Sequence, residues 1–181
     1  GDIDQDGILD ADNAQTVMEI YGDIVLDGLI IEFGYADGVA SPYDRGGGIF
    51  NSSSSQFKNC VFRDNWAPEG GAVYQANGNP TYIQCLFYDN ASSTNSSVFA
   101  ADQGAPALRN CVISGNTSPG SAIRVLDAAV TLNNSILWNN NIDILCAGSG
   151  SVTANNTLFQ DSSLPACGID GGGNIFGQNP L

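Results

Sequence analysis

A short block of residues recurs along this chain at a near-constant interval, and this recurrence limits the fold more than any other feature. Three clean copies are Phe57–Asn65 (FKNCVFRDN), Ile83–Asn90 (IQCLFYDN) and Leu108–Asn116 (LRNCVISGN). Later copies replace the cysteine by Ser135 and Thr157, and an earlier copy, Leu26–Ile31, carries Gly28 there. Successive copies of this small residue are 32, 25, 26, 24 and 22 residues apart. A repeat this short cannot bury a hydrophobic face alone, so the copies must stack on one another.

Each repeat also holds a second β-prone segment, 11 to 13 residues before the small residue, as in Gly47–Phe50 and Gly71–Tyr74. Asn, Gly, Ser and Pro separate the segments, which is typical of turns. Helical spacing is found only as a weak signal in the first turn or two after Asp10. The sequence therefore predicts an all-β chain whose short strands stack in parallel. Such a β-solenoid would have about five to six coils of 22–26 residues.

Two columns of equivalent residues support this stack, and we interpret both as structural ladders. The small residues are expected to point inward: Cys60, Cys85, Cys111, Ser135 and Thr157. A column of asparagines follows five residues later in the first four of these copies: Asn65, Asn90, Asn116 and Asn140. Their side-chain amides can hydrogen-bond from coil to coil. The rest of the expected core is apolar: Ile30, Ile49, Phe62, Val73, Phe87, Val98, Ile113, Ile123, Leu137 and Phe159.

The charge and composition of the chain exclude several classes of function. Nineteen acidic residues against five basic ones give a formal net charge of −14, so we expect no nucleic-acid binding and no docking to anionic membranes. There is no histidine, which excludes a Ser-His-Asp triad and His-ligated metals. No apolar run approaches the roughly 20 residues of a membrane span, so no membrane insertion is expected. Nothing predicts an organic cofactor.

The repeat blocks resemble those of a known family. Gly46–Ser52 (GGGIFNS) and Asn59–Asn65 (NCVFRDN) are similar to the right-handed parallel β-helix repeats of bacterial surface proteins, such as polymorphic outer-membrane-protein-like adhesins and the choice-of-anchor Q group. Gly1–Gly7, Asn134–Trp138 and Asn179–Leu181 are similar to recurring pieces of that group. The resemblance implies a right-handed β-helix in a secreted or surface-anchored protein. It also implies that the chain is an excerpt of a longer one.

An acidic segment at the start of the chain matches a calcium-binding loop. Asp2, Asp4, Asp6 and Asp10, with the Ile8 carbonyl, follow the D-x-D-x-D-G-x-x-D pattern. The twelfth position is Asn13, where an EF-hand has a bidentate glutamate. Calcium binding and a solvated acidic turn therefore both stay open.

A glycan-directed function is the alternative from a different class. Asp64 and Asp89 occupy the same column on adjacent coils, which would place two carboxylates within the roughly 5–10 Å that glycoside hydrolysis needs. The simpler interpretation is that both are turn residues beside the asparagine column. The charge of −14 would also repel an anionic polysaccharide.

Two rows of residues are predicted to face outward, because side chains alternate along a strand. One row follows the small column: Val61, Leu86, Val112, Ile136 and Leu158. The other lies on the preceding strands: Phe50, Tyr74, Phe99 and Arg124. Exposed apolar rows of this kind indicate a lateral partner, which would be a neighbouring domain, another copy of the chain or a glycan.

Cys146 and Cys167 lie outside the cysteine column and are 21 residues apart, close to one coil. A disulfide between adjacent coils is the favoured interpretation over a metal pair, and it suits an exported protein.

The sequence as a whole predicts an acidic N-terminal segment at 1–23, leading into a parallel β-helix at 24–181. We expect an extracellular or cell-surface structural or adhesive module, non-catalytic, that contacts neighbouring domains or its own copies and forms a filament in the latter case. A carbohydrate-binding or polysaccharide-degrading β-helix is the alternative.

Overall fold

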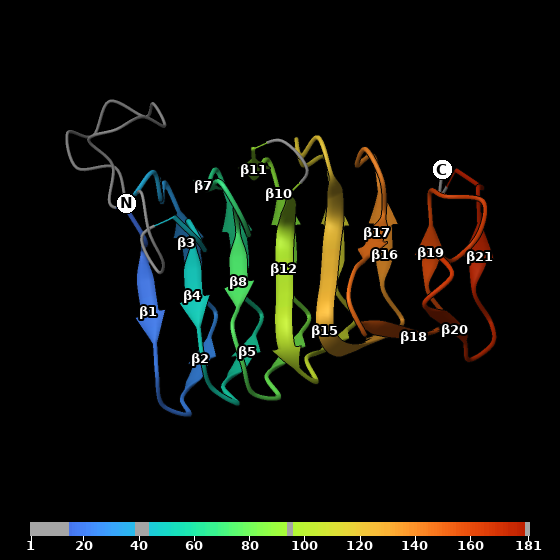
Figure 1. Cartoon of the computed structure of the whole chain (residues 1–181), viewed down its shortest axis with the longest axis horizontal. Coiled ribbons are helices and arrows are strands. Elements are labelled where there is room, and N and C mark those ends of the chain that lie inside the picture. The colour runs from blue at the N-terminus through green and yellow to red at the C-terminus, as the bar shows by residue number, and fades with distance from the viewer. Residues whose placement is uncertain (1–14, 39–43, 94–95, 180–181) are drawn as a thin grey trace.

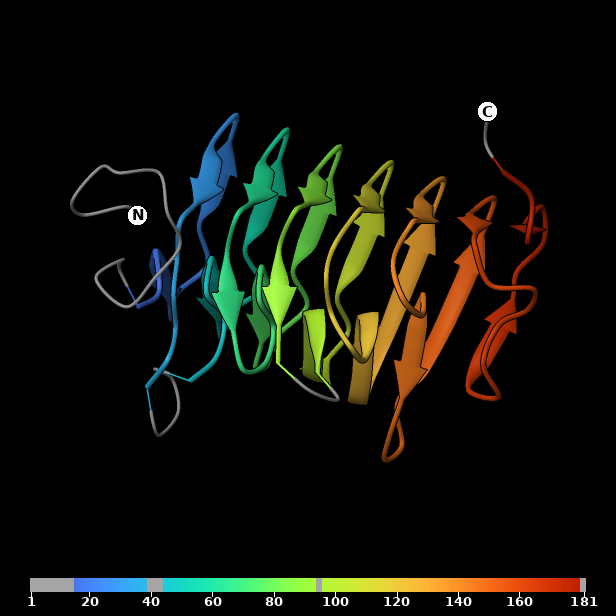
Figure 2. The same ribbon diagram turned by 90° about the horizontal axis from the view of Figure 1, so that it is seen from above.

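The chain folds into a rod of stacked coils (Figures 1 and 2). The computed structural model describes residues 15–38, 44–93 and 96–179, and within these ranges every regular element is a β-strand. All the strand pairings are parallel, and each strand pairs with its equivalent in the next coil. The prediction of an all-β parallel solenoid is therefore confirmed.

Each coil contributes strands to three faces. Face 1 contains β1 (Met18–Ile20), β4 (Ile49–Asn51), β8 (Val73–Gln75), β12 (Ser97–Gly104), the first half of β15 (Ser121–Asn133) and β17 (Ile144–Cys146). Face 2 contains β2 (Val25–Asp27), β5 (Gln56–Lys58), β9 (Thr81–Ile83), β13 (Ala107–Arg109), the second half of β15, β18 (Ser151–Asn155) and β20 (Gly168–Asp170).

Face 3 is a separate seven-stranded sheet. It contains β3 (Ile30–Glu32), β6 (Val61–Arg63), β10 (Leu86–Tyr88), β14 (Val112–Ser114), β16 (Ile136–Trp138), β19 (Leu158–Phe159) and β21 (Ile175–Phe176). A short pair, β7 (Trp66–Ala67) and β11 (Ala91–Ser92), lies between faces 3 and 1 along the chain. Strand β1 already pairs with β4, so the stack reaches back to Met18, inside the predicted N-terminal segment.

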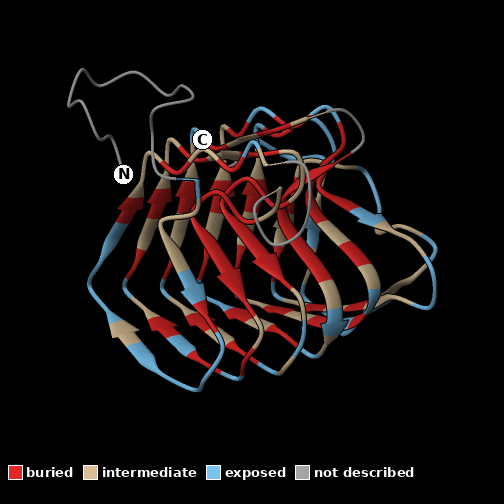
Figure 3. Ribbon diagram, turned by 60° about the vertical axis from the view of Figure 1, so that its left-hand side comes forward, coloured by how far each residue is buried: buried red, intermediate tan, exposed pale blue. Residues whose placement is uncertain are grey.

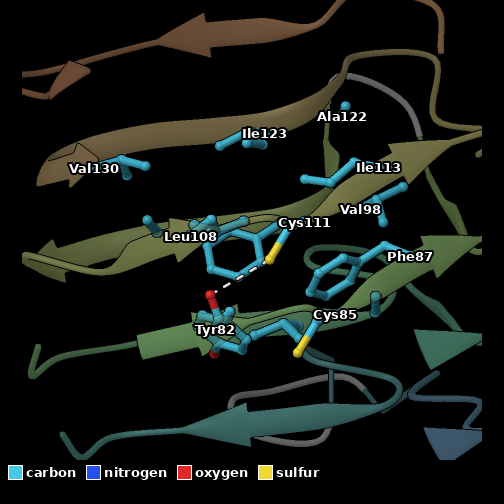
Figure 4. Packing of buried hydrophobic residues seen from close by; sticks show 14 of the residues in the cluster. Tyr82, Cys85, Phe87, Val98, Leu108, Cys111, Ile113, Ala122, Ile123 and Val130 are labelled. Carbon is cyan, nitrogen blue, oxygen red and sulfur yellow. Dashed lines mark hydrogen bonds between the residues drawn. The ribbon is translucent and has the colours of Figure 1, made fainter. Parts of the chain in front are cut away.

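The core is a continuous column of side chains inside the rod, contributed by all three faces (Figure 3). Equivalent residues stack on one another from coil to coil. The rings of Phe57 and Tyr82 stack with centroids 4.6 Å apart, and those of Phe62 and Phe87 stack at the same distance. Phe99 closes the cluster edge-on to Tyr82 (centroids 5.1 Å apart), and Figure 4 shows the aliphatic side chains that continue it. Such pairs add about 0.5–1.5 kcal/mol each beyond the area that they bury.

Two columns of left-handed residues make the turns. The turn from face 2 to face 3 has positive φ at Gly28, Asn59, Gln84, Asn110, Asn134 and Asn156. The turn that leaves face 3 has positive φ at Phe33, Asp64, Asp89, Gly115 and Asn139. Glycine, asparagine and aspartate tolerate this region better than other residues. The abundance of these residue types is thus a requirement of the repeated turn.

The asparagine column is buried immediately after the second turn. Asn90 Nδ2 donates to the carbonyl oxygen of Phe62 in the preceding coil (2.8 Å) and to Oδ1 of Asn116 in the next coil (3.1 Å). The backbone N–H of Asn90 also donates to Asn116 Oδ1 (3.1 Å). Asn65 and Asn116 repeat this pattern toward their own neighbours. Each amide therefore satisfies buried backbone groups of two coils.

The small column lies at the start of face 3, with Cys60, Cys85, Cys111, Ser135 and Thr157 all buried. Each of the three thiols donates to a carbonyl of the preceding coil. For Cys111 this acceptor is Tyr82 O (3.4 Å), the bond drawn in Figure 4. The column is thus a row of small side chains with satisfied polar groups.

The first repeat is shifted by one residue from the alignment that the sequence suggested. Gly28 stands in the left-handed column with Asn59, and Leu29 takes the place equivalent to Cys60. As a result Ile30 points outward and is 59% exposed, while Ile31 packs in the core against Phe62. The prediction that Ile30 belongs to the core is therefore wrong. The other predicted core residues are buried.

We expect Asn90→Ala to lower the free energy of unfolding by about 3 kcal/mol. The substitution removes the partners of the buried Asn65 N–H and the Phe62 carbonyl, and each unsatisfied buried group costs about 1–3 kcal/mol. Urea unfolding followed by circular dichroism measures the change. Asn77→Ala, at an exposed turn, is the matched control and should stay within about 0.5 kcal/mol. An equal loss in both variants would contradict a special role for the ladder.

Candidate functional site

The predicted calcium loop cannot be placed in the structure. Asp2, Asp4, Asp6, Ile8 and Asp10 lie outside the described residues. Calcium binding by this segment stays a prediction. Among the described residues there is no cluster of three or more acidic, cysteine or histidine side chains able to hold a metal ion.

The two weakly predicted catalytic carboxylates are neighbours on the turn that leaves face 3. Asp64 and Asp89 both have positive φ (52° and 53°) and lie on adjacent coils. Burial raises the pKa of the Asp64 carboxyl; Arg63 opposes this shift and Asp89 adds to it. Arg63 binds Glu32 more closely (2.5 Å) than Asp64 (3.9 Å). In later coils Gly115 and Asn139 occupy the same left-handed position of the turn. Asp64 and Asp89 therefore serve the backbone conformation of this turn, as those residues do.

An aliphatic row runs along the outside of face 3. The strand register aligns Val61, Leu86, Val112, Ile136 and Leu158, the residues predicted to face outward, and all five are half-buried. The same register extends the row to Ile30 at one end and Ile175 at the other. We call these seven residues the aliphatic row. Next to it, one outward position further along each strand, lie Arg63, Tyr88, Ser114 and Trp138.

The aromatic row on face 1 departs from the predicted outward row in two ways. Phe99 is fully buried in the core, because the register pairs it with Val73 and Ile123; Ala100 stands in the outward position. The prediction that Phe99 faces outward is therefore wrong. Phe50 and Tyr74 do stack on the outer side (centroids 5.7 Å apart), but they are also buried, together with Ala100. Only Arg124 of this row keeps an appreciable exposed surface.

A charged network accounts for the burial of Tyr74. Its hydroxyl donates to Asp102 Oδ2 (2.9 Å) and accepts from Arg45 Nη1 (2.6 Å), and the Arg45 guanidinium lies over its ring. Burial, more than the bond to Asp102, raises the pKa of Tyr74. Glu69 binds both Arg45 and Arg124, and burial lowers the pKa of Arg124. Sequence reasoning missed this network, because Arg45, Glu69 and Asp102 lie outside the repeated blocks.

The cysteines divide into two sets. Cys146 and Cys167 form a disulfide that links β17 to the residue preceding β20 (Cα atoms 6.4 Å apart). Cys60, Cys85 and Cys111 are free and buried. The neighbouring Cys85 thiol and burial raise the pKa of Cys60. The pKa of Cys85 is raised as well, whereas the Cys85 thiol lowers the pKa of Cys111.

A buried carboxylate, Asp143, and a half-buried one, Asp161, lie where the asparagine ladder ends, and both were missed from the sequence. The N–H of Asp143 donates to Asp161 Oδ2 (3.0 Å), and the N–H of Asp161 donates to Asp143 Oδ2 (2.8 Å). Asp143 is only 2% exposed, and its Oδ1 atom is buried without a hydrogen-bond partner. Burial raises the pKa of Asp143 to about 6. The sequence did carry one sign of this carboxylate. Asp143 precedes inward-facing Ile144, and the equivalent position in earlier coils holds a small or apolar residue: Gly48, Ala72, Val98 and Ala122.

This pair predicts that the fold gains stability in mild acid. A carboxyl group whose pKa is higher in the folded state than its ordinary 3.8 favours folding most when it is protonated. The gain should be complete below about pH 4 and lost as the pH rises through about 6, with a size on the order of 2–3 kcal/mol. Urea unfolding in metal-free buffer between pH 4.5 and 8 measures it, relative to Asp143→Asn.

Asp143→Asn should remove this pH-dependent difference, because the amide does not titrate. If the wild-type protein and the variant show the same pH dependence, the pKa of Asp143 is not raised. Asp127→Asn is the control. Asp127 is exposed, and its hydrogen bonds from Ser149 lower the pKa of its carboxyl instead of raising it.

The fold now defines the class of protein: a parallel β-helix with a continuous core and no regular element other than strands in its described part. A family model described as "Right handed beta helix region" matches residues 12–175. The chain belongs to this family of right-handed β-helices. No curated protein and no solved structure matches it. The described residues contain no helix long and apolar enough to span a membrane.

Proposed function

We propose that the chain is an extracellular structural or adhesive module of a surface protein, one that contacts other protein surfaces and turns over no substrate. The aliphatic row on face 3 is the observation that carries this proposal. It runs across all seven strands of the face, from Ile30 to Ile175. A contiguous apolar row of this length on an otherwise acidic rod is typical of a contact surface. The resemblance of the repeats to surface adhesins supports the same location outside the cell.

The distribution of exposed apolar side chains favours a second copy of the chain as the partner. Among the residues that the structure describes, the exposed large hydrophobic side chains all lie near one end of the rod or the other. They are Tyr21, Ile24, Val25, Leu29 and Ile30 in the first coil, and Ile142, Leu145, Ile169 and Ile175 in the last coils. Strands β3 and β21 are the edges of face 3, and edge strands present unpaired N–H and C=O groups. Head-to-tail pairing of such ends would give an open filament.

Light scattering and negative-stain electron microscopy of the purified chain test this proposal. We expect particles much larger than 18.8 kDa, in amounts that rise with concentration. Val25→Asp, at a residue that is 60% exposed in the first coil, should shift the population to monomers. Thr81→Asp is the matched control. Thr81 occupies the same row of face 2 as Val25, two coils further from the end of the rod. A monodisperse wild-type monomer at all concentrations would contradict self-association.

Carbohydrate binding is the second candidate function, and one feature favours it. Tyr88 and Trp138 stand in a single outward row of face 3, with Ser114 between them and Arg63 beside Tyr88. The rings are two coils apart, or about 10 Å at the usual strand spacing. Aromatic faces suit the C–H faces of sugar rings, and the polar side chains between them suit sugar hydroxyls. Polysaccharide cleavage would further require Asp64 and Asp89.

A glycan array tests this candidate, with Trp138→Ala as the variant. If the row binds a glycan, the variant should lose at least ten-fold in affinity, because one of two aromatic platforms is removed. Tyr74→Ala is the control. Tyr74 is only 3% exposed and is held by Asp102 and Arg45, so it cannot contact a sugar. No binding across neutral and charged glycans would remove this candidate.

A further inference from the structure

The last coil of the rod is attached to the body by fewer interactions than the coils before it. This terminal coil, residues 162–179, contains β20 and β21 and forms the C-terminal end of the rod (Figure 1). The two strands have only three and two residues. Among the described residues face 1 has no strand beyond β17. The asparagine ladder also ends before this coil, at Asn140.

The terminal coil buries none of its described side chains. Every residue from 162 to 179 is half-buried or exposed. Leu164 and Phe176 are the residues of this coil that pack against the core. In the preceding coil, by contrast, Val152 and Phe159 are fully buried. Segments with few buried apolar contacts are the first to open in a native protein, so the terminal coil is the part most easily detached.

The outer side of the terminal coil is polar. Asp170 continues the inward row of face 2 after buried Ala154. Its Oδ1 atom accepts the N–H of Gly172 (2.8 Å) and the amide of Asn174 (2.6 Å). The same Asn174 amide donates to the carbonyl oxygen of Ala154 (2.8 Å). Repeat proteins end in caps with a polar outer face, and the terminal coil is such a cap over an apolar core.

One disulfide cross-links this cap to the body, and it can be reached from solvent. It joins Cys146, at the end of β17, to Cys167, directly before β20. Both cysteines are half-buried and line the same surface cavity of about 250 Å³. The free thiols of the ladder are buried instead: Cys60, Cys85 and Cys111. Because thiol exchange depends on access, a small thiol reagent reaches the disulfide before it reaches the ladder.

We propose that this disulfide makes the terminal coil a cap that reduction releases. A thiolate of a dithiol reductant attacks one sulfur, the S–S bond breaks, and the other cysteine leaves as a thiol after taking up a proton. The second thiolate of the reductant then displaces the first cysteine in the same way. Two cysteines are thus reduced, and the dithiol is oxidised to a cyclic disulfide.

The cross-link holds the cap because it restricts the undocked state. Without it, residues 162–179 gain conformational freedom once they leave the body, and two short strands with no buried side chain offset little of that gain. The coils before them are held on three faces and by the asparagine ladder, so they stay folded. The reduced protein would then present the apolar residues Val152, Ala154 and Phe159 where the oxidised protein presents a polar cap.

Hydrogen exchange read by mass spectrometry tests the proposal on the full-length chain, with and without dithiothreitol. After reduction we expect the amides of β20 and β21 to exchange at least about ten-fold faster, and those of β6 and β12 to stay unchanged. The double variant Cys146→Ser, Cys167→Ser should show the fast exchange without reductant. Cys85→Ser is the control, because it keeps the disulfide and the equivalent residue of a later coil is Ser135. Its terminal coil should respond to reduction like that of the wild-type protein.

Two results would overturn the proposal. If β20 and β21 keep their protection after labelling shows that Cys146 and Cys167 are reduced, the remaining contacts hold the cap without the disulfide. If β6 and β12 lose protection together with β20 and β21, the disulfide stabilises the whole rod and there is no separate cap. The wild-type comparison needs no substitution, so it decides the question even where the double variant does not fold.

Discussion

Every coil of this protein must turn out of face 3 while its backbone stays buried, and the asparagine ladder is the interaction that makes this turn possible. Asn65, Asn90 and Asn116 each donate to a carbonyl of the coil before and to the side-chain oxygen of the asparagine in the coil after. Because the pattern recurs once in each coil from Asn65 to Asn140, it fixes the register of these coils. The aromatic columns then align inside the rod, and the aliphatic row aligns outside.

The repeats of the sequence were enough to predict the fold, because one column of small residues and one of asparagines recur at coil spacing. They were not enough to fix every register. Gly28 resembled the small column but serves a left-handed turn, which moved Ile30 from the predicted core to the surface. Phe99 has the aromatic character of outward-facing Phe50 and Tyr74, but the register pairs it with inward-facing Val73 and puts Ala100 opposite Tyr74; a shift of one residue exchanges the inside and outside of a strand. The Asp143–Asp161 pair could not be predicted, since it depends on contacts between irregular segments.

The candidate functional features lie where the repeat is free to vary. Inward positions accept only residues that pack or satisfy the ladder, whereas outward positions carry the aliphatic row, the Tyr88–Trp138 row and the network around Glu69. The ends of the rod carry the most exposed apolar side chains. A rigid scaffold with variable outer rows is suited to surface presentation, and β-helices host unrelated activities on the same core. The fold alone therefore does not determine the partner.

Hydrogen exchange measured by NMR tests the central role of the ladder most directly. The amides of Asn65, Asn90 and Asn116 lie in turns, yet each donates to the side chain of the next coil. The account predicts that they exchange as slowly as the amides of the buried strands, because they open only when the stack unfolds. Exchange as fast as that of exposed turn amides would show that the ladder does not hold the coils together, and would contradict the account.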